Sequence, residues 1–183
     1  MSANTSWTID PTHTNVEFAV RHLMIATVKG RFGDVKGIVQ LDLGNPAAAR
    51  VDVTIAAPSL DTRNADRDAH LRSPDFFDVE RFPELRYESR KVEPLPDGTF
   101  RVIGDLTIRD VTREVPLHAT LEGTGADPWG GHRAGFSATG KLNRSDYGLV
   151  WNKALETGGV VVGEEVKLAI EAELVQAAAR AAA

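Results

Sequence analysis

Three of the five histidines, His13, His22 and His70, fall in the first half of the chain. Asp10 and Asp68 stand close to two of them. Imidazole and carboxylate groups together can hold a catalytic zinc ion. No short metal-binding spacing such as HExxH links the histidines, and His13 and His22 stand at opposite ends of one predicted strand. We therefore predict no metal site, and we keep a metal-dependent enzyme that uses the three histidines as an alternative.

Two charge pairs stand in predicted loops or turns: Arg67 beside Asp68, and Arg144 near Asp146. An arginine at the mouth of a binding site can hold a phosphate or quinone oxygen through charge-assisted hydrogen bonds. The same pairs can instead fasten surface segments to the rest of the protein, and we favour this second role. Ser145 lacks the GxSxG setting of a serine hydrolase. These residues predict no catalytic residue and no cofactor.

The elements that position these residues follow from the alternation of apolar and polar side chains, which is typical of half-buried strands. Eight segments show it, at residues 16–20, 28–43 with a break near Gly33, 51–55, 85–89, 100–108, 115–121, 134–142 and 166–174. About eight antiparallel strands can close a barrel, which leaves no exposed edge. We therefore predict a mainly β protein, an eight-stranded antiparallel barrel with one α-helical insertion. Its apolar faces point inward and its charged faces point to water.

The helical insertion is predicted by the segment DTRNADRDAHLRSPDFFDVERFP, where period and charge density change. Asp61 or Thr62 can serve as the N-cap. Asp68 and Arg72 form an opposite-charge pair at i,i+4. The pair Ser73–Pro74 ends the helix, because proline disfavours helical angles in the residue before it. The insertion, at about 61–80, is expected to rest on the barrel as a flap.

Function turns on whether the barrel is filled or hollow. Small residues gather on one predicted strand, at Ala134, Ala138 and Gly140, where a filled core favours Leu or Ile. Either they leave a channel, or they pack against Phe rings opposite. A hollow apolar interior favours a long apolar ligand, since burial contributes about 25 cal/mol per Å².

We predict that apolar side chains of the barrel bind this ligand: Phe18, Val20, Phe32, Val39, Leu41, Leu106, Phe136 and Ala138. Phe76 and Phe77 of the flap are expected to close one end. Trp151 stands in a long connection, at 149–163, of the kind that often forms a lid. It is expected to guard the open end or to contact a second subunit.

Five segments spread over the chain carry a family resemblance: WTIDPTHTNVEF, VKGRFGDVKG, RDAHLRSPDFFDVERFP, GDLTIRDVTREV and NRSDYG. Together they resemble the YceI-like family of lipid- or polyisoprenoid-binding proteins. The resemblance implies a lipocalin-like barrel with a helix packed against it. It also implies an isoprenoid-type or other amphiphilic lipid as the ligand, and a homodimer.

Composition excludes several other functions. A net charge of −5 argues against nucleic acid binding, which normally needs a basic face. No apolar run is long enough to span a membrane. The absence of cysteine rules out disulfides and thiol catalysis. The first residues show no secretory signal, so we expect a cytoplasmic protein.

These observations predict one domain over residues 1–176, followed by an Ala-rich tail at 177–183 that is frayed or disordered. The predicted function is non-enzymatic binding, sequestration or transport of an isoprenoid-type or other amphiphilic lipid. Besides the metal-dependent enzyme, a filled barrel that serves as a protein-interaction module stays open as an alternative.

Overall fold

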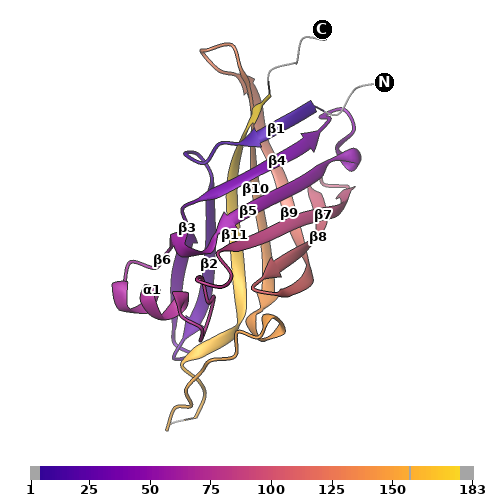
Figure 1. The fold of residues 1–183 in the computed structure, drawn as a ribbon. Coiled ribbons are helices and arrows are strands. Elements are labelled where there is room, and N and C mark those ends of the chain that lie inside the picture. Colours follow the sequence, from indigo (N-terminus) through magenta and orange to yellow (C-terminus); the bar gives the residue numbers. More distant parts are fainter. Residues whose placement is uncertain (1–4, 157, 178–183) are drawn as a thin grey trace.

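A ring of eight antiparallel strands forms the body of the protein (Figure 1). The computed structural model describes residues 5–156 and 158–177. In spatial order the ring consists of β1 (Thr5–Ile9), β4 (Val35–Leu41), β5 (Arg50–Ala56), β7 (Glu84–Pro94), β8 (Phe100–Ile108), β9 (Val111–Ala126), β10 (His132–Asn143) and β11 (Val162–Gln176). It closes where β1 pairs with β11, with Trp7 opposite Gln176 and Ile9 opposite Leu174. The predicted eight-stranded barrel is therefore confirmed.

Three further strands extend the sheet beside the lower half of β11. After β1 the chain turns and continues along β11 as β2 (Asn15–His22), which pairs with β3 (Ala26–Phe32). A short strand, β6 (Leu60–Asp61), pairs in turn with the end of β3. The sequence had predicted one long strand broken near Gly33, and the structure has the break between β3 and β4. The two halves of this strand thus lie at different places in the sheet.

Close contacts with the neighbouring strand explain two glycines of this region. A Cβ on Gly30 would lie 2.3 Å from Cζ of Phe18, whose ring covers the opposing β3 backbone. A Cβ on Gly37 would lie 2.6 Å from the carbonyl oxygen of Asp52 on β5. No real Cβ contact is this short, so both positions require glycine for the sheet to coil as it does.

The flap contains one α-helix, α1 (Ala65–Arg72), which begins two or three residues later than the predicted N-caps imply. Asn64, and neither Asp61 nor Thr62, is the N-cap: its side chain accepts a hydrogen bond from the amide of Arg67. The reason is tertiary, because Asp61 already belongs to β6. The helix ends at Ser73, as predicted.

The predicted ion pair between Asp68 and Arg72 is also wrong. Asp68 is buried and accepts hydrogen bonds from the amide and the hydroxyl of Thr62. Arg72 donates to the carbonyl oxygens of Pro58 and Leu60, at 3.0 and 2.7 Å. Both side chains therefore fasten the helix to the strand segment before it.

Short 3₁₀ helices at Pro46–Ala48, Ala57–Ser59 and Arg144–Tyr147 (η1, η2 and η3) connect the strands. No helix among the described residues is long and apolar enough to cross a membrane. Of the predicted tail, Ala177 donates a backbone hydrogen bond to Ser6, and residues 178–183 lie outside the described part of the chain.

Candidate ligand-binding site

The ring, together with β2, β3 and the flap, surrounds a cavity of about 320 Å³. Side chains of both the N-terminal and the C-terminal strands line it, and nearly all of them are aliphatic or aromatic. Its polar lining residues are Thr14, Tyr87 and Arg144. A volume near the lower end of the range for small-molecule pockets, with so few polar groups, fits an apolar ligand.

Ten of the eleven residues predicted to bind ligand line this cavity: Phe18, Val20, Phe32, Val39, Leu41, Phe76, Phe77, Leu106, Phe136 and Ala138. Alternation along each strand explains the eight that lie on strands, because residues two apart share one face. Phe76 and Phe77 come from the flap. Phe18 and Phe136 pack against the buried core yet keep part of their surface exposed. Their role in binding stays a prediction.

The small residues on the inner face serve two different purposes. Ala138 lines the cavity and leaves room there. At Gly104, in contrast, a Cβ would lie 2.5 Å from the ring of Tyr87, and at Gly140 it would lie 2.7 Å from Cδ2 of Leu117. These two glycines are covered by larger neighbours. Some small residues thus line the cavity and others are packed over, but the covering side chains at these glycines are Tyr87 and Leu117 and not the predicted Phe rings.

Two of the three polar lining residues are occupied by hydrogen bonds within the protein. The Tyr87 hydroxyl lies 3.0 Å from the carbonyl oxygen of Val115 and 3.2 Å from that of Val102. Burial of this phenol, followed by the nearby carboxylate of Asp105, raises the pKa of Tyr87. The Thr14 hydroxyl accepts a hydrogen bond from the amide of Glu173.

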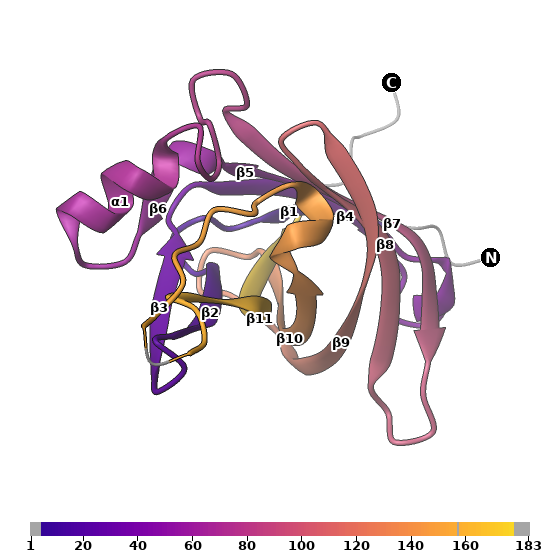
Figure 2. The same cartoon turned by 90° about the horizontal axis from the view of Figure 1, so that it is seen from below.

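The third, Arg144, is buried at the lower end of the barrel, where η3 and the segment that follows it lie across the strand ring (Figure 2). A guanidinium group has five N–H donors. Those of Arg144 meet five acceptors: the carbonyl oxygens of Leu149, Trp151, Val162 and Gly163 and the carboxylate of Glu164. Burial lowers the pKa of Arg144. The side chain therefore fastens this segment and has no donor left for a ligand head group.

The flap closes over the barrel through aromatic contacts. Phe77 packs edge-on against Phe32 of β3, with ring centroids 5.7 Å apart. Phe76, also part of the cavity wall, packs against His70 of α1 and against Trp151. Trp151 itself does not line the cavity. It lies behind Phe76, with its ring 4.6 Å from that of His70, so it joins the lower segment to the flap.

A protein-family model described as the YceI-like domain matches residues 7–174, nearly the whole chain. The chain belongs to the YceI-like family. A UPF0312 protein of Staphylococcus aureus is 36% identical over 170 residues, which cover 92% of this chain and 96% of that protein. This YceI-like chain is thus similar to a relative of almost the same extent.

Solved structures agree with the YceI-like fold. The YceI protein of Campylobacter jejuni is 30% identical, covers 86% of this chain and 90% of its own, and superposes with a TM-score of 0.73. A polyisoprenoid-binding domain from Saccharophagus degradans has a TM-score of 0.69 over 94% of this chain and 99% of its own. At 13% identity, that second likeness shows the fold alone.

The three histidines of this YceI-like chain do not meet. His13 precedes β2, His22 ends it, and a strand of eight residues separates them by roughly 25 Å. His70 belongs to α1, where its Nε2 lies 2.8 Å from a carboxylate oxygen of Asp75. The cluster that a metal-dependent enzyme would need is therefore not formed by these residues.

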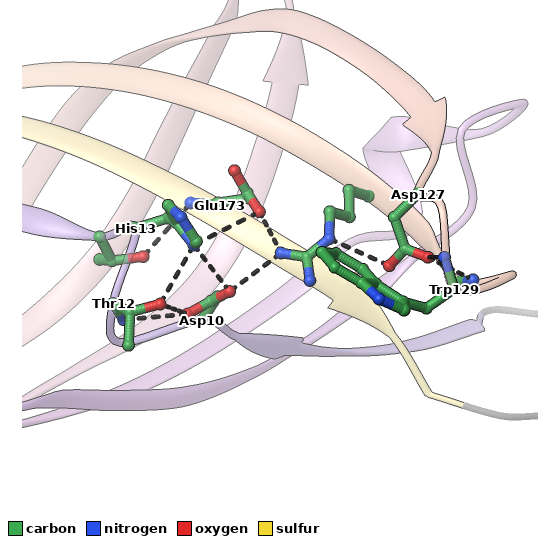
Figure 3. A network of polar contacts seen from close by, with 9 residues as sticks. Asp10, Thr12, His13, Asp127, Trp129 and Glu173 are labelled. Carbon is green, nitrogen blue, oxygen red and sulfur yellow. Dashed lines mark hydrogen bonds and ion pairs between the residues drawn. The ribbon is translucent and has the colours of Figure 1, made fainter.

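His13 instead belongs to a surface network with Asp10, Glu173 and Arg133 (Figure 3). The two carboxylates and the imidazole lie close enough together to hold a metal ion. The Arg133 guanidinium, however, already contacts both carboxylates and supplies the positive charge between them. It also reaches Asp127, which fixes the turn between β9 and β10.

Hydrogen bonding sets the protonation of this network. Bonds from Thr12 and then His13 hold the pKa of Asp10 well below its usual range. The bond to Asp10, followed by the charge of Glu173, raises the pKa of His13. The network therefore pairs the Arg133 cation with the ionised carboxylates of Asp10 and Glu173.

Proposed function

We propose that this protein binds an isoprenoid-type or other amphiphilic lipid in its cavity without transforming it. The observation that carries the proposal is an interior in which every polar lining side chain is already hydrogen-bonded within the protein. In such a site each Å² of apolar ligand surface that is buried contributes about 25 cal/mol to the binding free energy, and no free polar side chain is available to orient a reacting group. A solved structure of the same fold is described as a polyisoprenoid-binding domain, which supports the same ligand class.

A carrier or storage role without catalysis follows from the same argument. Among the described residues that line the cavity there is no serine, cysteine or lysine, no carboxylate and no imidazole, and the two hydroxyl groups, of Thr14 and Tyr87, take part in hydrogen bonds within the protein. The head group of an amphiphile would remain near the mouth, where water can solvate it. A homodimer and a cytoplasmic location, both expected from the sequence, stay predictions.

The variant Ala138→Phe tests the placement of the ligand. Its ring would fill the cavity beside Phe136, and phenylalanine suits a strand. We expect at least about a tenfold loss of affinity for geranylgeraniol, measured by fluorescence competition, because more than about 1.4 kcal/mol of apolar burial is lost. Circular dichroism and the melting temperature should show a folded protein.

Ala169→Phe is the matched control, since Ala169 is exposed on the outer face of β11. This control should bind geranylgeraniol as the unmodified protein does. Unchanged affinity in a folded Ala138→Phe variant would contradict the placement. Unfolding of that variant would contradict the hollow interior, because overpacking costs about 1–3 kcal/mol only where a core is already dense.

A further inference from the structure

The turn between β2 and β3 exposes three consecutive apolar side chains. Leu23, Met24 and Ile25 are 36%, 53% and 78% exposed. Most large apolar side chains of the chain are at least partly buried in the barrel. Isolated exposed apolar residues are normal on protein surfaces, but a contiguous run at the tip of a hairpin asks for an explanation.

The conformation of this turn gives a second, independent observation. Leu23 and Met24 both have left-handed backbone angles, with φ of 51° and 62°, and the Ile25 amide donates to the carbonyl oxygen of His22. Turns of this kind strongly favour asparagine and glycine, because a branched or bulky side chain is strained there. The sequence therefore keeps apolar side chains at positions where the backbone conformation disfavours them and where they are only partly buried.

The turn is held firmly against the lower segment of the chain. The amide of Leu23 donates to the carbonyl oxygen of Val161 at 2.9 Å, and Arg21 donates to the carbonyl oxygen of Met24 at 3.0 Å. The β2–β3 turn and the segment between η3 and β11 together form the lower end of the molecule (Figure 1). That segment also carries Val150, 66% exposed, and Trp151, which packs on the flap.

The geometry points to a lipid bilayer as the occupant of this turn. Three side chains on a protruding tip fall far short of the roughly 800 Å² that each partner of a stable protein complex buries. They are enough, however, to enter the boundary between head groups and acyl chains. Arg21 and Lys153 are exposed beside the turn and can meet anionic head groups, while the carboxylates of this end, Glu156 on the same segment and Asp146 and Glu164 at its borders, offset the positive charge.

We propose that the apolar turn Leu23–Ile25 docks the lower end of the barrel on an anionic lipid bilayer. Docking would bring the segment between η3 and β11, which contacts both the turn and the flap, close to the membrane that supplies the ligand. The inference rests on the proposed function, since it supplies the route by which a membrane lipid reaches the cavity.

The decisive variant is Leu23→Asn combined with Met24→Gly. We expect its affinity for phosphatidylcholine vesicles containing phosphatidylglycerol, measured by flotation, to fall at least about tenfold. Its melting temperature should be equal or higher, because the new residues suit the left-handed turn. The control Ile38→Ser removes an apolar side chain that is 52% exposed on β4, and it should float as the unmodified protein does.

Two results would overturn the docking proposal: no flotation of the unmodified protein, or equal flotation of the double variant. A protein dimer that the double variant abolishes, without vesicle binding, would also overturn it in favour of a second copy. Binding of geranylgeraniol from detergent solution separates the two proposals. If the unmodified protein binds geranylgeraniol but does not float with the vesicles, only the docking proposal fails. If the protein does not bind geranylgeraniol, the proposed function fails.

Discussion

Arg144 lines the cavity, but its guanidinium donates hydrogen bonds to backbone carbonyl groups. These groups lie at the two ends of one long connection, Leu149 and Trp151 at one end and Val162 and Gly163 at the other. Its role is therefore to close the lower end of the barrel with a fixed loop. The head group of a bound lipid has to find its partners elsewhere.

Replacement of Arg144 by methionine should lower the free energy of unfolding by at least about 3 kcal/mol, because it leaves buried carbonyl groups without a donor. Urea unfolding measures the change. The matched control is Lys141→Met, which breaks an exposed ion pair with Glu165 and should cost less than about 1 kcal/mol. A stable Arg144→Met variant that has lost lipid binding would instead assign the guanidinium to the ligand.

His13 gives the surface network a pH dependence with a definite sign. Its pKa is raised in the folded protein, so protonation favours the folded state. The contribution is complete below the ordinary imidazole pKa of about 6.5 and is lost as pH rises through the raised value. We expect His13→Gln to be less stable than the unmodified protein at about pH 6 and equal to it by about pH 9. Equal differences at both pH values in urea unfolding would contradict this account.

At the scale of elements, the flap and the loop held by Arg144 form one closure. Trp151 links them, since its ring contacts His70 of α1 and Phe76 of the cavity wall. The helix itself is fastened on its other side by Arg72 and Asp68. A ligand that enters from this end has to displace the aromatic contacts, whereas the hydrogen bonds of Asp68, Arg72 and Arg144 can remain.

Trp151→Ala should therefore loosen the flap without unfolding the barrel. Two aromatic contacts of about 0.5–1.5 kcal/mol each predict roughly tenfold or faster amide exchange in α1, and faster release of geranylgeraniol. Hydrogen exchange with mass spectrometry measures the first effect and stopped-flow fluorescence the second. The control is Trp129→Ala, because Trp129 is 84% exposed in the turn between β9 and β10. This substitution should change neither the amide exchange nor the release of geranylgeraniol. Unaltered exchange in α1 would show that Trp151 does not hold the flap.

The elements differ in how far the sequence predicts them. Alternation found the long strands and, through them, the inward side chains such as Phe18 and Phe136. It missed β1, although Trp7 and Ile9 alternate there, because five residues give a weak signal and their partners, β4 and β11, are distant in the chain.

The N-cap of α1 and the orientation of Trp151 could not be predicted from the sequence for a related reason. Several residues before the helix can cap it, and the pairing of β6 with β3 decides which one does. Trp151 stands in a connection without periodicity, so nothing local indicates that it turns toward the flap. Both features depend on contacts between segments that are far apart in the chain.

At the scale of the whole molecule, a single sheet surrounds the cavity and also shields it from water. The pairing of β1 with the end of β11 closes the upper part of the ring, and β2, β3 and β6 widen its lower part toward the flap. The inner face then stays only partly filled, with the small residue Ala138 among those that line the cavity. A hollow apolar barrel covered at one end by aromatic side chains is the structural basis of the proposed lipid binding.

Mass spectrometry of the gently purified protein, native against denatured, tests whether the cavity holds an apolar ligand. We expect an excess native mass that extracts into organic solvent, that has an isoprenoid-type or similar apolar chain, and that is lost in Ala138→Phe but kept in Ala169→Phe. An excess mass that belongs to a metal ion, or a native mass equal to that of the bare chain after exposure to geranylgeraniol, would contradict it.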